Sequence, residues 1–123
     1  MTMPDERMRA LRWGGELLEQ IACDTSLPDS MIGAAKRISL TYPTPQALED
    51  RLRSGAIGLP PDWTTALLDA LELFHELRVG AIGSARTRSD VRYALRHFPD
   101  KMTMRAMSRT SSIQEWLSLP INW

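Results

Sequence analysis

Residues 62–78 read Asp-Trp-Thr-Thr-Ala-Leu-Leu-Asp-Ala-Leu-Glu-Leu-Phe-His-Glu-Leu-Arg, and this stretch decides the fold of the chain. Apolar side chains recur in it at intervals of three and four, which is the spacing of one face of an α-helix. The stripe consists of Trp63, Ala66, Leu67, Ala70, Phe74 and Leu77, and it lies opposite Asp69, Glu72 and Glu76. We therefore predict a helix over residues 62–78 that forms the central element of a hydrophobic core.

The same spacing predicts helices on both sides of this stretch. Pro43 and Pro99 each end a helix, because proline lacks an amide hydrogen and restricts the residue before it. Thr44 is expected to cap a short helix that begins at Pro45, and Thr87 with Asp90 is expected to form a capping box at the start of a later one. The predicted ranges are about 4–22, 29–41, 45–53, 87–97, 100–107 and 112–117.

Apolar residues at helical spacing in these segments are expected to face the core. Gly14 lies within the apolar face of the first helix, where glycine costs about 1 kcal/mol relative to alanine. We expect close approach of a neighbouring helix, or a kink, to accompany it. The expected inward residues are Met8, Leu11, Leu18, Ile21, Ala22, Ile32, Ala35, Ile38, Tyr42, Leu48, Leu52, Val91, Ala94, Leu95 and Phe98.

Two related segments are expected to close helices. Residues 52–58 and 77–83 read Leu-Arg-Ser-Gly-Ala-Ile-Gly and Leu-Arg-Val-Gly-Ala-Ile-Gly. Gly55 and Gly80 are predicted to adopt the left-handed conformation of a helix C-cap, with Arg53 and Arg78 facing the negative end of each helix. A phosphate-binding loop is the other interpretation, but neither segment has the Gly-Lys-Ser/Thr sequence of such loops.

No segment has the length and alternation of a strand, so the predicted fold class is all-α. We expect a compact bundle of six or seven helices that forms a single domain over residues 1–123. Shifting the chain by 56 residues aligns seven identical residues, among them Leu11 with Leu67 and Pro43 with Pro99. This suggests two helical-hairpin pseudo-repeats, about 1–58 and 59–110, followed by a C-terminal arm over 111–123.

Composition and charge narrow the class of protein. The 123 residues are 43% hydrophobic and 24% charged, as in ordinary globular domains. Fifteen basic and fifteen acidic residues cancel, so the overall charge directs the chain neither to nucleic acid nor to an anionic membrane. Cys23 is the single cysteine. Because the opening residues are charged, we expect no secretory leader, and no apolar run reaches the length of a membrane-spanning helix. The expected compartment is the cytoplasm, and no membrane partner is expected.

The residues do not assemble into an obvious reaction centre. His75-Glu76 begins like a metalloprotease helix, but Val79 occupies the position of the second histidine. Glu72, His75 and Glu76 share a helix face that could in principle bind a divalent cation, but a solvated polar face is the simpler interpretation. His97 and Cys23 lie at helix ends, where a cation is favoured and a thiol is not activated. We expect no catalytic residue, no metal and no cofactor.

Positive charge is concentrated late in the chain. Residues 78–109 contain eight basic and two acidic residues. Arg88, Arg92 and Arg96 are spaced by four, which aligns them along one helix face. Together with Arg105 and Arg109 they suit phosphate oxygens or an acidic protein surface, because guanidinium binds such groups bidentately. A solvated arginine face is the simpler alternative.

The end of the chain offers a second candidate surface. Trp116, Leu119, Ile121 and Trp123 make residues 116–123 apolar and free of charged side chains. They are expected either to fold back on the chain's own helices or to dock on a partner, including a second copy. Residues 104–117 also fit a helix-turn-helix, but the second helix would bring no lysine or arginine to DNA.

Several short motifs resemble a group of small bacterial proteins of unknown function that are known by a locus-tag name. The motifs are residues 2–7 (Thr-Met-Pro-Asp-Glu-Arg), 9–11, 27–28, 42–43, 96–99 (Arg-His-Phe-Pro) and 112–117 (Ser-Ile-Gln-Glu-Trp-Leu). The similarity spreads over most of the chain outside residues 53–61. Each motif lies at a predicted helix start or end, so the resemblance implies the same helical layout and no catalytic or ligand residue.

The sequence therefore predicts a non-catalytic protein-interaction or adaptor domain. It would act through the apolar C-terminal arm, through the basic face of the fifth helix, or through both. The alternative is a nucleic-acid-associated regulator that binds phosphates through the arginine-rich face.

Overall fold

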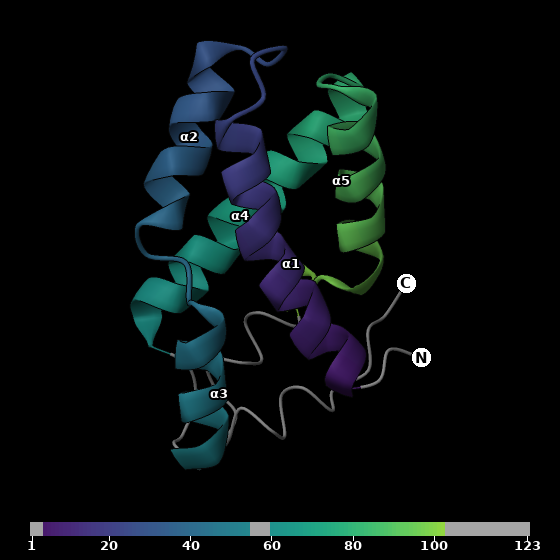
Figure 1. Ribbon diagram of the computed structural model, residues 1–123. Helices are drawn as coiled ribbons and strands as arrows, with labels where there is room; N and C mark the ends of the chain where they lie inside the picture. Colours follow the sequence, from purple (N-terminus) through teal and green to yellow (C-terminus); the bar gives the residue numbers. More distant parts are fainter. Residues whose placement is uncertain (1–3, 55–59, 103–123) are drawn as a thin grey trace.

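The computed structural model describes residues 4–54 and 60–102, apart from the side chains of residues 4–8 and 52 (Figure 1). These residues form five helices and no strand, which confirms the all-α class. The helices are α1 (Pro4–Ala22), α2 (Asp29–Ser39), α3 (Pro45–Ser54), α4 (Pro61–Gly80) and α5 (Ala85–His97).

Other parts of the predicted layout lie outside the described residues. They include the helix predicted over 112–117, all but the first three residues of the one predicted over 100–107, and the arm over 111–123. A total of six or seven helices is therefore not confirmed. The relation between the two pseudo-repeats also stays a prediction.

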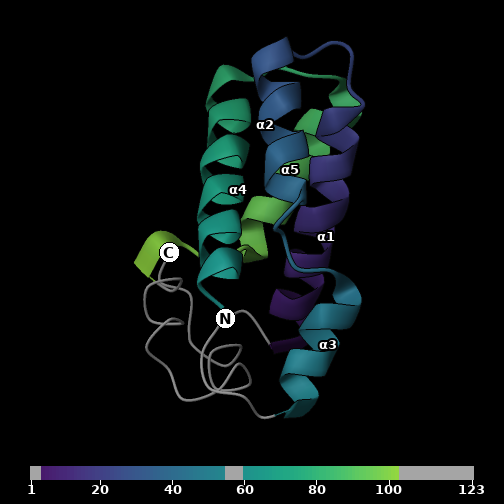
Figure 2. The same cartoon turned by 90° about the vertical axis from the view of Figure 1, so that its left-hand side faces the viewer.

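Four of the helices form the body of the bundle. α1 packs against α2 and α5, and α4 packs against the same two helices from the other side. In Figure 1, α4 crosses behind α1, and Figure 2 shows α3 extending from one end of the bundle. The chain thus builds its core between α1 and α4, with α2 and α5 closing the sides.

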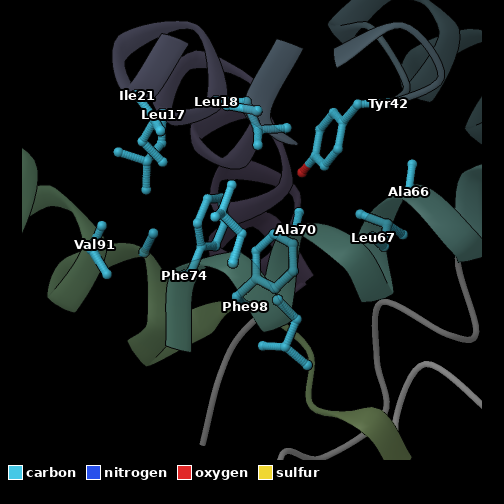
Figure 3. Packing of buried hydrophobic residues seen from close by; sticks show 14 of the residues in the cluster. Leu17, Leu18, Ile21, Tyr42, Ala66, Leu67, Ala70, Phe74, Val91 and Phe98 are labelled. Atoms are coloured by element: carbon cyan, nitrogen blue, oxygen red, sulfur yellow. The ribbon is translucent and has the colours of Figure 1, made fainter. Parts of the chain in front are cut away.

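The core is centred on α4, as the apolar stripe predicted. Phe74 is fully buried among Leu11, Leu18 and Ile21 and the other core residues, and its ring meets that of Phe98 edge-on at 5.5 Å between centroids (Figure 3). Burial of each such side chain stabilises the fold by about 1.5–3 kcal/mol. Phe98 follows α5, so this ring pair holds the end of α5 to the middle of α4.

Most residues expected to face the core do so, although the apolar face is wider than predicted. Ala22, Ile32, Ile38, Trp63 and Leu95 are only partly buried, and Met8 and Leu52 are outside the described side chains. Leu17, Leu71 and Leu73 are buried although the spacing did not single them out. α4 has to cover two neighbouring helices, which explains the additional leucines.

Gly14 is a point of close approach, but the neighbours are side chains and not another helix backbone. A Cβ at Gly14 would lie 2.8 Å from Cε2 of Phe98 and would overlap the Tyr42 hydroxyl. That hydroxyl donates a buried hydrogen bond of 2.6 Å to the carbonyl oxygen of Leu11, which lies at the same level of α1. Burial raises the pKa of Tyr42, so the phenol stays neutral and able to donate.

Several helix ends differ from the prediction. α2 ends at Ser39, two residues early, whereas the Thr44 cap is confirmed by a 3.1 Å bond from the Ala47 amide to Oγ1 of Thr44. α5 begins at Ala85 because the hydroxyl of Ser84 accepts the Thr87 amide. The predicted Thr87–Asp90 capping box is therefore wrong, and both side chains have other partners.

The predicted cap at Gly80 is also wrong. α4 continues through Gly80, and the left-handed residue is Ala81, with φ 48° and ψ 42°. Glycine is needed instead at Gly83, where φ is 101° and a Cβ would lie 3.2 Å from Leu27. The turn thus ends against the α1–α2 loop, a contact that the local sequence does not reveal. Gly55 lies outside the described residues.

Within the described residues, none of the five helices is both long enough and apolar enough to cross a membrane.

Gly14→Ala is expected to lower the free energy of unfolding by about 1–3 kcal/mol, because the new methyl group overpacks the site that Tyr42 and Phe98 fill. Urea unfolding followed by circular dichroism measures the change. Gly33→Ala is the matched control within α2, since a Cβ there would meet only Nη1 of Arg37 at 3.6 Å. It is expected to raise stability by up to about 1 kcal/mol. A Gly14→Ala variant as stable as the native chain would contradict the close approach.

Candidate functional site

α5 presents three different faces, because a helix turns once in 3.6 residues. Thr87, Val91 and Ala94 are buried in the core. Arg88, Arg92 and Arg96 are exposed on a second face, as their spacing predicted. Side chains on the third face line a groove against α1. Both candidate surfaces of the described residues therefore share this helix.

The arginine face comprises Arg78, Arg88, Arg92 and Arg96, all of them exposed. Arg88 and Arg92 of α5 line a shallow pocket of about 260 Å³ together with Arg78 from the last turn of α4. The sequence placed Arg78 in the basic segment but not in the binding site. The missing information was the packing of α4 on α5, which brings the two helices' arginines to one pocket.

No carboxylate among the described residues forms an ion pair with the arginine face. Ion pairs between described side chains include those of Arg12 and Arg53 with Glu49, of Arg86 with Asp90 and of Lys101 with Glu72. Partial burial and the positive charges of Arg78 and Lys101 lower the pKa of His75. The guanidinium groups of the arginine face therefore carry positive charge that no described carboxylate pairs with, and such charge attracts anions.

The other predicted site residues lie outside the described part of the chain. These are Arg105 and Arg109 of the anion site, and Trp116, Leu119, Ile121 and Trp123 of the arm. Their roles stay predictions.

A second surface, the α1–α5 groove, was not predicted. Its volume is about 770 Å³, and it runs between residues 13–23, at the end of α1 and just after it, and residues 86–94 of α5. The ring centroids of Trp13 and Tyr93 are 4.7 Å apart at an interplanar angle of 56°, and the Tyr93 ring meets His97 edge-on. Both aromatic residues lie beside the apolar stripe of their helix, which is the one local signal of this surface. Their meeting depends on how α1 packs against α5.

The start of α5 is held by a carboxylate in the α1–α2 loop. Oδ2 of Asp24 accepts hydrogen bonds from the Ser84 amide at 3.1 Å and from the Thr87 hydroxyl at 2.7 Å. Its Oδ1 accepts from the amide and the hydroxyl of Ser26, at 3.0 Å and 2.5 Å. The Ser26 hydroxyl, the Ser84 amide and the Thr87 hydroxyl hold the pKa of Asp24 well below its usual range.

Thr87 connects this carboxylate to α1. The buried Thr87 hydroxyl accepts hydrogen bonds from Nε2 of Gln20 at 3.1 Å and from the Ser84 hydroxyl at 3.0 Å, while it donates to Asp24. Its one donor and both acceptor positions are therefore used. The network attaches the N-terminus of α5 to the C-terminal part of α1. It thereby fixes the orientation of α5, whose side chains contribute to both candidate surfaces.

The described residues contain no group of three or more His, Cys, Asp or Glu side chains placed to hold a metal ion, and Glu72, His75 and Glu76 do not form one. Cys23 is exposed and lines the α1–α5 groove.

Comparison of the chain with protein-family models, with curated proteins and with solved structures gives no match. The resemblance to the small bacterial proteins stays a prediction.

Asp24→Asn is expected to destabilise the protein at pH 7 by about 1–2 kcal/mol, because the amide replaces a charged acceptor of four hydrogen bonds. The pKa of Asp24 is lower in the folded state than its ordinary value of 3.8. Its stabilising contribution is therefore complete above that value and declines as the pH falls below it.

Urea unfolding at pH 7 and at pH 3 measures both effects. The difference in the free energy of unfolding between the native protein and Asp24→Asn should be smaller at pH 3 than at pH 7. The control is Asp69→Asn, which removes the same charge at an exposed position of α4. If both variants lose the same free energy of unfolding, the hydrogen bonds of Asp24 do not stabilise the fold beyond the general effect of removing a charge.

Proposed function

We propose that this protein is a non-catalytic, cytoplasmic protein-interaction domain that binds an acidic segment of a partner protein through the arginine face. The observation that carries the proposal is the convergence of Arg78, Arg88 and Arg92 on one pocket, with Arg96 one turn further and no ion pair to any described carboxylate. Like charges this close repel one another, and an anionic partner relieves the repulsion.

The spacing of the arginines suits a repeating carboxylate partner. Residues four apart on a helix are separated by about 6 Å along its axis. An acidic helix with Glu or Asp at every fourth position has the same repeat, so it can pair with Arg88, Arg92 and Arg96 in register. Guanidinium groups bind carboxylates bidentately and stay charged at all physiological pH values, which makes such pairing independent of proton transfer.

Carboxylates on the neighbouring surfaces favour a short acidic segment of a protein over a large polyanion as the partner of the arginine face. Asp69, Glu72 and Glu76 line a separate acidic pocket beside α2, and Glu16 and Glu19 line the α1–α5 groove. A nucleic acid duplex presents phosphates over a wide surface and would meet these carboxylates as well. A short acidic segment can occupy the arginine face alone.

Nucleic acid is the second candidate, and the regular arginine row favours it. Guanidinium groups spaced along one helix also fit successive phosphates. The chain's formal net charge of zero lowers the general attraction to a polyanion. Salt dependence distinguishes the two candidates. For duplex binding, the logarithm of the binding constant falls with the logarithm of the salt concentration, with a slope of about 0.9 for each phosphate contacted.

Replacing Arg88, Arg92 and Arg96 together with glutamine is expected to weaken binding of an acidic helical peptide by about tenfold or more. The probe is a fluorescent peptide of alanine with glutamate at every fourth position, measured by anisotropy. Three exposed ion pairs at up to about 1 kcal/mol each account for a loss of this size. The matched control replaces Arg9, Lys36 and Arg37, which are exposed and carry the same total charge. It should bind as the native protein does.

A labelled DNA duplex is titrated in parallel at about 50 and 200 mM salt. Tight, strongly salt-dependent duplex binding that the triple variant loses, without binding of the acidic peptide, would favour the regulator. Equal loss in the control variant would mean that general charge, and not this face, determines binding.

A further inference from the structure

The α1–α5 groove is long enough to bind a helix. Its lining residues run from Trp13 on α1 to Cys23 directly after α1, and from Arg86 to Ala94 on α5. At 1.5 Å per residue, these stretches are about 15 Å and 12 Å long. A groove of about 770 Å³ stretched along two helices is longer than one small group requires, and it matches two to three turns of a third helix.

The apolar part of the groove consists of Trp13, Leu17, Tyr93 and Ala94, and most of its other lining residues are polar or charged. Leu17 and Ala94 are 4% and 2% exposed and belong to the hydrophobic core. The Trp13 and Tyr93 rings lie against each other beside them, and Tyr93 remains 47% exposed. Large amphipathic rings on a packed apolar base are the residues that dominate binding energy at protein interfaces.

The charges along the groove determine which charge its partner should carry. Glu16 and Glu19 are exposed, and neither forms an ion pair with another described residue. Asp90 is paired with Arg86, at 3.7 Å between Oδ2 and Nε. The groove therefore carries two uncompensated negative charges next to two aromatic rings, and both features attract lysine and arginine side chains.

We propose that the α1–α5 groove binds a basic amphipathic helix of a partner protein. The leucine-type side chains of that helix would pack on Leu17 and Tyr93, and its lysine or arginine side chains would pair with Glu16 and Glu19. The chain's own arm, residues 111–123, contains Glu115 and no lysine or arginine, so it lacks the required cations. This inference does not depend on the arginine face, which attracts the opposite charge and lies on another side of α5.

The test uses the full chain and a 15-residue helical peptide of alanine, leucine and lysine, with leucines on one face and lysines flanking them. Calorimetry measures the affinity. We expect micromolar binding to the native protein and at least a tenfold loss in the double variant Glu16→Lys, Glu19→Lys. The matched control is Asp69→Lys, Glu76→Lys, which makes the same charge change on α4 and should bind normally.

Two further variants locate the binding site. Tyr93→Ala is expected to weaken binding at least tenfold, with helicity checked by circular dichroism, because the ring is a central contact. The variant with glutamine at Arg88, Arg92 and Arg96 should bind the basic peptide as the native protein does. Loss of binding in that variant would place the peptide elsewhere and overturn the proposal, whereas failure to bind acidic peptides would affect only the proposed function.

Other occupants give different results. Equal affinity for a scrambled peptide, or for the peptide with glutamate in place of lysine, would overturn the proposal. A native dimer that dissociates in the Glu16→Lys, Glu19→Lys variant would identify a second copy as the occupant. Saturable binding of tetramethylammonium without binding of the peptide would show a small-cation site, and it too would overturn the proposal.

Discussion

The missing side chain at Gly14 is the constraint on which the rest of the bundle depends. It lets two aromatic rings reach the surface of α1 at one level, Tyr42 from beyond the end of α2 and Phe98 from beyond the end of α5. Tyr42 donates to the backbone of α1, and Phe98 meets Phe74 in the middle of α4. All four helices of the bundle therefore converge at a single place (Figure 3). A methyl group there would push the Tyr42 and Phe98 rings away from α1.

α5 is held at both ends by different kinds of interaction. At its C-terminal end, the aromatic contact with Phe74 is non-polar and buried. At its N-terminal end, Asp24, Ser84 and Thr87 form hydrogen bonds that require particular directions. The apolar contact sets how close α5 lies to the core, while the polar network sets its rotation. The rotation of α5 about its axis determines which of its side chains lie on the arginine face and which line the α1–α5 groove.

Two outward faces of opposite character follow from this placement. The arginine face collects positive charge from α4 and α5, whereas the α1–α5 groove combines aromatic rings with unpaired carboxylates. Under the two proposals made above, one helix would hold an acidic segment on one side and a basic helix on the other, as an adaptor requires. The chain as a whole is neutral, yet it carries local surfaces of opposite charge.

Local periodicity was enough to predict the five helices of the described residues, apart from some of their ends, together with the apolar stripe of α4 and the arginine row of α5. Each of these depends on residues three and four apart, and the helical backbone fixes their relation without reference to the rest of the chain. The start of α5 and the left-handed residue after α4 were predicted wrongly, because Ser84 and Gly83 are positioned by Asp24 and Leu27, about sixty residues away in sequence. Tertiary structure alone decided that Arg78 joins the arginine face and that Trp13 meets Tyr93. Such meetings depend on the angle and rotation at which helices pack, and these follow from close contacts between distant residues that no repeat in the sequence encodes.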